Sequence, residues 1–312
     1  MNSPDKNIVS IRRIIVGLDL SYMDEVLIRY AALVCKTFPV ERVYFMHVAR
    51  DLELPKDIKE KYPHVLAPVD EGIHRDIEQK LDKHFDKSLL VEKVVEVKDG
   101  SPIEKMIKWA KYRDVDLILM GRKKSLEGSG IVSSKIACKA YCSVLFVPEN
   151  PPEKISRILI PIDFSEHSYL AIQHGLDIAA RKEATVACSH VYSVPLGYYK
   201  TGKGYQEFAD IMHEHSHKEY KLFLKKLGIS DHDIPCRMIL SKPEKMAKET
   251  YDYASSHDFD FVVIGSKGRT GASAMLMGSF AEKFTYLNHH VPLLIAKNKG
   301  ETMGFFEALT KI

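Results

Sequence analysis

Four glycine and serine positions near the end of the chain carry its most specific chemistry. The pattern Gly-x2-Gly-x9-Gly-Ser begins at Gly265 and Gly268 and ends at Gly278 and Ser279. A glycine lacks a side chain, so backbone N–H groups can approach phosphate oxygens closely, and the serine hydroxyl adds one donor. These residue types at this spacing predict a phosphate-binding loop.

The elements that must position this loop are visible on either side of it. An apolar, β-branched run at 261–264 predicts a buried strand, and 280–284 reads as the first turns of a helix. A glycine loop between a strand and a helix N-terminus is an anion site, because the helix dipole favours negative charge there. Neither a Walker A loop nor a dinucleotide fingerprint after the first strand fits the spacing. A plain turn with a tight helix start explains only one or two of the glycines.

The chain is one unit written twice. Residues 12–21 return as 156–165, residues 45–48 as 188–191, and residues 114–121 as 258–265. The interval from Asp19 to Gly121 equals the interval from Asp163 to Gly265. Matched intervals of this kind indicate a duplication. The 312 residues suffice for two domains of about 150 residues each.

Apolar runs alternate with amphipathic segments in each half, which predicts an α/β fold. We expect two tandem doubly wound domains, each a parallel sheet with helices on both faces. In the second half the expected strands are 157–162, 185–191, 236–240, 260–264 and 292–296, and the expected helices are 166–181, 206–227, 243–256 and 279–289. The predicted domains are 1–150 and 151–297, followed by a C-terminal tail, 298–312.

Three parts of the second half are expected to converge on one crevice. Asp163 ends the first strand, Val191 the second, and Gly265 follows the fourth. Ligands of open parallel sheets bind beyond the carboxyl ends of the strands, at the switch point. A carboxylate there can accept hydrogen bonds from ribose hydroxyls, and the backbone near Val191 can meet a purine edge. Taken alone, Asp163 also fits a helix cap or turn before Ser165. With the glycine pattern, nucleotide binding is the better interpretation.

These residues resemble the universal stress protein family in its tandem form, over residues 12–297. The matching motifs are 161–165, the pair His190 and Val191, and the glycine pattern. The resemblance implies five-stranded parallel sheets of order 3-2-1-4-5 and bound ATP, with or without Mg²⁺. It also implies that the two halves pair within the chain, with further homodimerisation left open. The predicted nucleotide-binding residues are Pro161, Asp163, Val191, Ile264, Gly265, Gly268, Arg269, Gly278, Ser279 and Phe280.

The resemblance assigns separate parts of ATP to separate residues. It implies ribose on Asp163, adenine at Val191, and phosphates on the glycine loop and Ser279. The helical pair His213 and His217 is left open between a zinc site and a solvated helix face. Arg269 is left open between a contact with a terminal phosphate or a partner's carboxylate and a solvated loop position. Tyr198, Tyr199 and Tyr205 are left open between a lid and a flexible insertion.

The first half departs from the pattern at the loop. Lys124 stands where the second glycine would be, and Ile131 replaces the serine when Gly130 is aligned with the third glycine. Asp19 and Val48 remain, so a ribose and base pocket is retained in the sequence. The loop has therefore lost a glycine that would let its backbone approach phosphates closely, and it has lost the serine hydroxyl. We therefore predict a degenerate site that binds ATP weakly or not at all.

Composition excludes several other classes of function. The formal net charge is +3 with both signs mixed, which argues against a nucleic-acid-binding stripe or a membrane surface. No apolar run approaches the roughly 20 residues of a membrane span, and the first residues lack the apolar core of a signal peptide. Five scattered cysteines are not a disulfide framework. We expect a cytoplasmic protein.

The sequence favours a binding protein over a fast enzyme. No catalytic constellation and no metal site is assigned beside the predicted phosphate loop. The leading interpretation is an ATP-binding stress-response sensor or adaptor. A slow ATPase or nucleotidyl-transferring enzyme using the same pocket, and a nucleotide-independent dimerisation scaffold, remain as alternatives.

Overall fold

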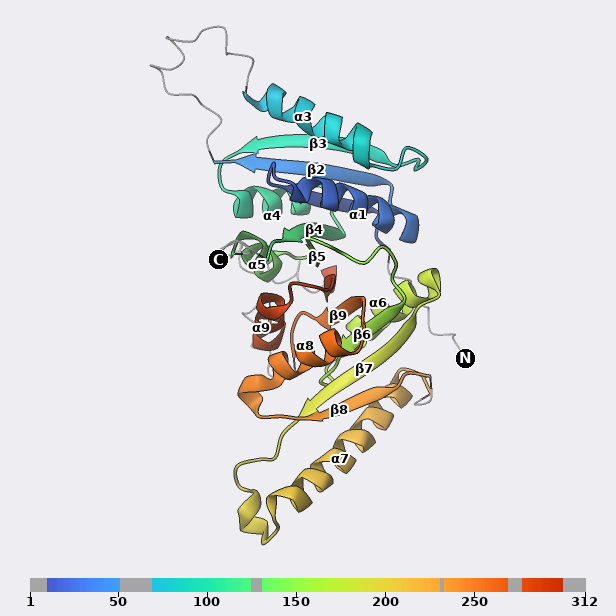
Figure 1. Ribbon diagram of the computed structural model, residues 1–312, viewed down its shortest axis with the longest axis vertical. Coiled ribbons are helices and arrows are strands. Elements are labelled where there is room, and N and C mark those ends of the chain that lie inside the picture. The colour runs from blue at the N-terminus through green and yellow to red at the C-terminus, as the bar shows by residue number, and fades with distance from the viewer. Residues whose placement is uncertain (1–9, 51–68, 125–130, 231–232, 269–276, 300–312) are drawn as a thin grey trace. The chain divides into compact units, whose positions relative to one another are not determined.

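The chain forms two compact units, Ser10–Pro151 and Pro152–Asn298 (Figure 1). The structure, a computed structural model, describes residues 10–50, 69–124, 131–230, 233–268 and 277–299. Among the described helices, none combines the length and the hydropathy needed to span a bilayer. The predicted tail, 298–312, lies almost entirely outside the described residues.

The first unit alternates strands and helices from one end to the other. Its elements are β1 Arg13–Leu18, α1 Met23–Thr37, β2 Arg42–Ala49, α3 Val69–His84, β3 Glu92–Asp99, α4 Pro102–Tyr112, β4 Leu117–Arg122, α5 Ile131–Lys139 and β5 Ser143–Pro148. Pro102 stands in the first turn of α4, where its missing N–H costs no helical hydrogen bond.

The second unit repeats this order. Its elements are β6 Arg157–Pro161, α6 Glu166–Lys182, β7 Thr185–Tyr192, η1 Tyr198–Thr201, α7 Tyr205–Lys226, β8 Cys236–Leu240, η2 Pro243–Lys245, α8 Met246–Ser256, β9 Phe261–Gly265, α9 Ser279–Leu287 and β10 Leu293–Ala296. The sequence predicted every strand and α-helix of this half. The single helix expected over 243–256 divides into a 3₁₀ turn and α8, and the turn η1 lies inside the connection that was left open as a lid or an insertion.

The strands of each unit pair only in parallel, which confirms the predicted α/β class. In the first unit β1 lies between β2 and β4, with β3 beyond β2 and β5 beyond β4. In the second unit β6 lies between β7 and β9, with β8 beyond β7 and β10 beyond β9. The chain leaves the central strand in one direction and later returns on its other side. That reversal at β6 creates a switch point at the carboxyl ends of β6 and β9.

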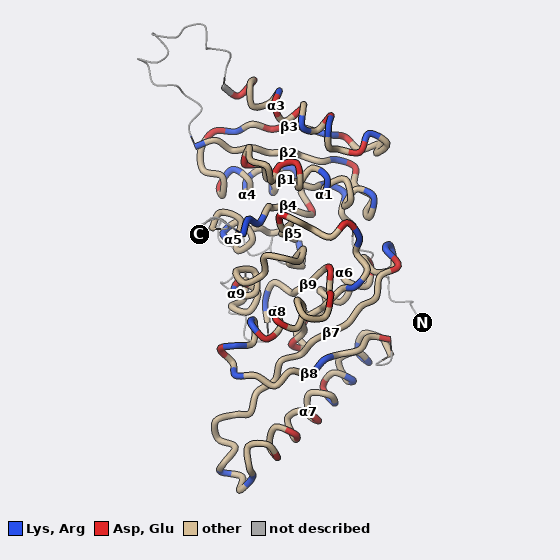
Figure 2. Tube along the Cα trace, in the orientation of Figure 1, with Lys and Arg blue, Asp and Glu red and all other residues tan. Residues whose placement is uncertain are grey.

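Helices cover both faces of these sheets. Four consecutive residues of β2, Val43 to Met46, are all buried, and so are Phe261 to Ile264 of β9. Successive side chains of a strand point to opposite faces, so burial of every residue requires cover on both sides. Figure 2 shows Lys and Arg interspersed with Asp and Glu along α3, β3 and α7. The described surface of these elements therefore carries mixed charge.

A buried histidine lies in α6 of the second unit. The helix packs closely on β6, since a Cβ built on Gly175 would lie 2.4 Å from Cδ1 of Ile160. His174, one residue earlier, is 6% exposed, and its Nδ1 has no hydrogen-bond partner among the described residues. Burial disfavours the charged imidazolium and lowers the pKa of His174 to about 4. The histidine is therefore neutral in the folded protein at neutral pH.

We predict that His174 makes stability fall as the pH is lowered from about 6.5 to 4. An unfolded histidine has a pKa of about 6.5, so in this window the unfolded state binds the extra proton and gains stability. Urea unfolding at pH 7 and pH 4.5 should show a loss about 2–3 kcal/mol larger for wild type than for His174→Leu. Equal losses in the two proteins would show that the pKa of His174 is not lowered by folding.

Candidate functional site

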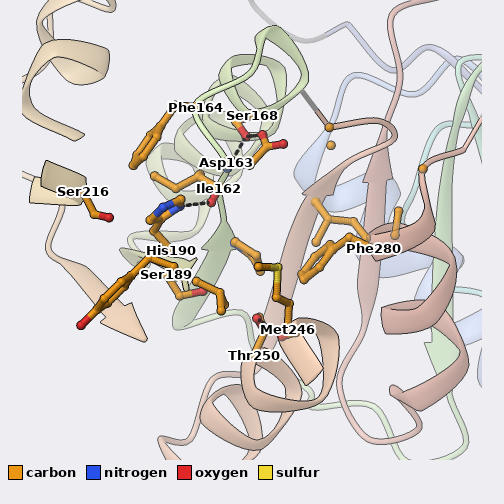
Figure 3. A pocket seen from close by; sticks show the side chains of 18 of the residues that line it. Ile162, Asp163, Phe164, Ser168, Ser189, His190, Ser216, Met246, Thr250 and Phe280 are labelled. Atoms are coloured by element: carbon orange, nitrogen blue, oxygen red, sulfur yellow. Dashed lines mark hydrogen bonds between the residues drawn. The ribbon is translucent and has the colours of Figure 1, made fainter. Parts of the chain in front are cut away.

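A cavity of about 690 Å³ opens at the carboxyl ends of β6, β7 and β9, beside the first turn of α9 (Figure 3). This is the switch point of the second sheet, where open parallel sheets bind ligands. Side chains from α7 and α8 complete its walls. The cavity lies within the size range of small-molecule sites, about 300–1,000 Å³.

Asp163 occupies a tight turn between β6 and α6. Its Oδ1 accepts the Ser165 N–H at 3.1 Å and the Ser168 hydroxyl at 2.7 Å, while its own N–H donates to the Ser168 Oγ at 2.9 Å. Ser165 caps α6 by accepting the Ser168 N–H at 3.2 Å. Phe164 takes the left-handed conformation, with φ of 66°, so that the chain can turn between them. Of the two roles considered for Asp163, the structure shows the turn role, because Ser165 is the cap; the turn uses one carboxylate oxygen of Asp163 and orients the other.

The second oxygen of Asp163 faces the glycine loop. A Cβ built on Gly268 would lie 2.6 Å from Asp163 Oδ2, so the carboxylate takes the space that a side chain would need. The loop backbone and the carboxylate therefore line the same part of the cavity. Only glycine permits this approach, because the turn hydrogen bonds hold the aspartate in place.

The two other glycines of the pattern have different physical roles. A Cβ on Gly265 would lie 2.6 Å from the backbone carbonyl oxygen of His167, so this glycine lets β9 pack against α6. A Cβ on Gly278 would meet the Lys267 Cα at 3.4 Å and the Gly268 nitrogen at 3.5 Å, which are ordinary contacts. The fold itself thus requires glycine at 265 but tolerates a larger residue at 278.

The N-terminus of α9 opens on the cavity. Gly278 is its N-cap residue, in extended conformation, and its N–H donates to the Ser266 carbonyl at 2.7 Å. Within the described part of the chain no side chain caps this helix, and Ser279, Phe280 and Ala281 of its first turn all line the cavity. The first N–H groups of a helix have no partner within the helix and carry partial positive charge. This end of the cavity is suited to an anion.

The opposite part of the cavity is mainly apolar. Val191, Met246 and Ile264 contribute to it from β7, α8 and β9. His190 is held nearby because its Nδ1 lies 2.9 Å from the Ile162 carbonyl oxygen and its ring stacks on Phe164 at 4.3 Å. An apolar wall beside a carboxylate and an anion site can accommodate a flat ring joined to a polar, charged group.

Nine of the ten predicted nucleotide-binding residues line this cavity. Arg269 lies outside the described residues. The sequence missed the contributions of α7 and α8, of β7 residue Ser189, and of Lys267 in the loop. Of these, Ser189 lies in the repeated segment 188–191 and Lys267 lies within the glycine pattern, so both carried a signal in the sequence. The nine residues brought together are Pro161, Asp163, Val191, Ile264, Gly265, Gly268, Gly278, Ser279 and Phe280.

A family model described as the universal stress protein family matches residues 10–148 and again 154–296. The chain belongs to the universal stress protein family. A universal stress protein of Methanocaldococcus jannaschii is 28% identical over 145 residues, which cover 45% of this chain and 81% of that protein. A universal stress protein from Archaeoglobus fulgidus has a similar structure, with a TM-score of 0.62, 18% identity, and coverage of 93% of this chain and 97% of that one.

Another solved relative is a universal stress protein in complex with cAMP. It is 14% identical with a TM-score of 0.33, and the match covers 44% of this chain and 97% of that one. The long match to the Archaeoglobus fulgidus protein is a likeness of fold across both tandem domains.

In the first family domain, the carboxylates at the matching position lie in ion pairs. Lys123 Nζ lies 2.5 Å from Asp19 Oδ2, and the Lys123 side chain is 12% exposed. Asp24 stands where the second unit has Ser168. It accepts the Asp19 N–H at 3.0 Å and forms an ion pair with Lys80 at 2.7 Å. In the second domain Lys267, the counterpart of Lys123, makes no ion pair with Asp163 among the described residues.

The ion pair with Lys123 affects Asp19, the carboxylate that the sequence analysis kept as a candidate for ribose binding. Burial raises the pKa of Asp19, but hydrogen bonds from Lys123 and Ser21 outweigh it and the pKa is lowered overall. Asp19 is thus a carboxylate already paired with an internal cation. Gly130, aligned with Gly278, lies outside the described residues.

The histidine pair on α7 gains little support as a metal site. The rings of His213 and His217 lie 4.6 Å apart, and burial, then the charge of His213, lowers the pKa of His217. Among the described residues, no group of three or more metal-binding side chains is assembled. The tyrosine cluster of the connection is held by ring contacts of Tyr198 with Tyr199, Tyr205 and Phe208.

We predict opposite roles for two glycines of the pattern in the ligand-free protein. Gly265→Ala should destabilise the second unit by about 1–3 kcal/mol, because its Cβ meets the α6 backbone. Gly278→Ala should change stability by no more than about 0.5 kcal/mol, because its Cβ finds ordinary contacts. Chemical denaturation of both variants measures the difference. A loss at Gly278 as large as at Gly265 would contradict the assignment.

Proposed function

We propose that the second domain binds ATP and that the protein acts as a stress-response sensor or adaptor. The observation that carries the proposal is the meeting of Asp163, Gly268 and the α9 N-terminus in one cavity. The carboxylate would accept hydrogen bonds from ribose hydroxyls, and the helix N-terminus with Ser279 would hold the phosphates. Membership of the family supports placing the ribose and the phosphates of ATP at these residues. The apolar wall near Val191 supports placing the adenine there.

The residues present fit this nucleotide chemically. Gly278 gives the fold no steric reason to be glycine, whereas a phosphate approaching its backbone would give one. Lys267 also lines the cavity and adds positive charge beside the loop. Bound Mg²⁺ would further neutralise the phosphates.

We also propose that the first domain does not bind ATP, so that the chain takes up one nucleotide. The support is the ion pair between Lys123 and Asp19, which engages the carboxylate that a ribose would need. The five cysteines are free thiols, which fits our proposal of a cytoplasmic protein.

Asp163→Asn is the sharpest substitution for the proposed site. Asparagine keeps a carbonyl oxygen for the Ser165 and Ser168 hydrogen bonds but loses the charge and the second acceptor. Calorimetric titration should show ATP affinity about 10–100-fold weaker, the value of a charge-assisted hydrogen bond. The matched variant, Asp19→Asn, should leave affinity and the one-to-one stoichiometry unchanged. Equal effects of the two would overturn the proposed asymmetry.

Gly278→Val should abolish ATP binding without unfolding the protein, because its side chain would fill the space of the phosphates. For wild type, ATP at 100 times its dissociation constant should raise the melting temperature by about 5–10 °C. The variant should show no such rise, while substitution of Gly130 should leave it unchanged. Wild-type protein that neither releases nucleotide on denaturation nor responds to ATP would instead support a scaffold.

The binding-only role is separable from catalysis by a single-turnover assay. We expect purified protein mixed with limiting ATP and Mg²⁺ to return the ATP intact, because the proposal assigns no general base or nucleophile. Prompt, metal-dependent release of ADP or AMP would establish the enzymatic alternative. The same assay on Gly278→Val controls for a contaminating ATPase.

A further inference from the structure

One polar side chain of the cavity is not used by the proposed function. Ser189 lies on β7, in register with Pro161 of β6, between His190 and the α8 residues Met246 and Thr250 (Figure 3). The neighbours of Ser189 along the strand face α6 and α7, since His190 stacks on Phe164. Ser189 therefore faces the other side of the sheet, where α8 lies.

The hydroxyl of Ser189 is buried without a partner. The residue is 1% exposed, and its Oγ makes no hydrogen bond within the part of the chain that the structure describes. Thr250, another hydroxyl residue of the cavity, donates to the Met246 carbonyl at 2.9 Å. Folded proteins rarely leave a buried hydroxyl unsatisfied, because its desolvation is then uncompensated. Ser189 needs a partner that the surrounding walls do not supply.

The surroundings restrict where that partner can come from. The Ser189 carbonyl already accepts the Ile162 N–H at 2.8 Å, as part of the sheet. The nearby cavity residues Val191, Met246 and Ile264 offer no polar side-chain group beyond a thioether. The hydroxyl turns about a single bond, so it can follow an atom that enters the cavity. A ligand is the natural source of the missing partner.

The duplicated half provides an internal comparison. The matched strand of the first unit places Met46 at the position of Ser189, and Met46 is 1% exposed. The half whose Asp19 is paired with Lys123 thus has an apolar side chain there. The hydroxyl occurs in the half that keeps the complete glycine pattern.

We propose that Ser189 is a specificity-determining residue, whose hydroxyl donates a hydrogen bond to a ring nitrogen of the bound purine. This inference rests on the proposed function of the same cavity. The apolar walls accept the flat ring, and a ring nitrogen is an uncharged acceptor suited to a hydroxyl donor. A buried donor that bonds the correct ligand rejects an analogue lacking the acceptor, because the donor is then left unpaired.

The test compares Ser189→Ala with wild type in the full-length chain, using ATP, 1-deaza-ATP, 3-deaza-ATP and 7-deaza-ATP, which together remove each ring-nitrogen acceptor in turn. Wild type should bind one deaza analogue about 3–10-fold more weakly than ATP, the value of a neutral hydrogen bond. Ser189→Ala should bind ATP more weakly by a similar factor and no longer discriminate against that analogue. Without ligand, the variant should melt at the same temperature as wild type or higher, because it removes an unsatisfied buried hydroxyl.

Thr285→Val is the matched control. The Thr285 hydroxyl is buried outside the cavity and donates to the Ala281 carbonyl at 2.7 Å, so its loss should lower the melting temperature and leave the analogue ratio unchanged. Ser189→Ala that keeps the wild-type discrimination, or that melts lower without ligand, would overturn the inference. Wild type that binds no ATP at all would overturn the proposed function itself, which is a different result.

Discussion

The candidate site depends on one close approach, between the carboxylate of Asp163 and the backbone of Gly268. The 2.6 Å between Asp163 Oδ2 and a Cβ built at 268 leaves no room for any side chain. The approach is possible because Gly265 lets β9 pack directly against the first turn of α6. The first two glycines of the pattern thus have different roles. Gly265 allows β9 to pack on α6, and Gly268 leaves space for the carboxylate of Asp163. The anion site and the carboxylate share one cavity for this reason.

The fold was predictable from the sequence because the two halves of the chain are repeats of one another. Alternating apolar runs and amphipathic segments predicted each strand and helix of the second half, and the repeat removed the ambiguity of any single run. The differences are local. The turn η2 covers Pro243–Lys245, and α8 starts only at Met246. Sequence periodicity does not resolve a change of this kind within one turn.

The site was predictable only where it is local in the sequence. The spacing of motifs in the sequence identified Asp163 and the glycine pattern. Met246 and Thr250 line the cavity because of how α8 packs, and sequence spacing does not indicate that packing. The pairing of Lys123 with Asp19 was missed for a related reason. The loop substitutions were interpreted as a loss of permissive backbone. Spacing did not show that Lys123, a lysine also present in the second half as Lys267, pairs with a carboxylate about a hundred positions away, because that contact depends on the sheet.

The ion pair between Lys123 and Asp19 also bears on how the stability of the first half depends on ligands. A ligand that approaches Asp19 would have to compete with the cation that the chain already places beside it. Under the function proposed for the second domain, a ligand in its cavity would stabilise that half in proportion to the logarithm of the ligand concentration. If the proposed function holds, every molecule would therefore carry a half whose stability depends on the ligand and a half whose stability does not.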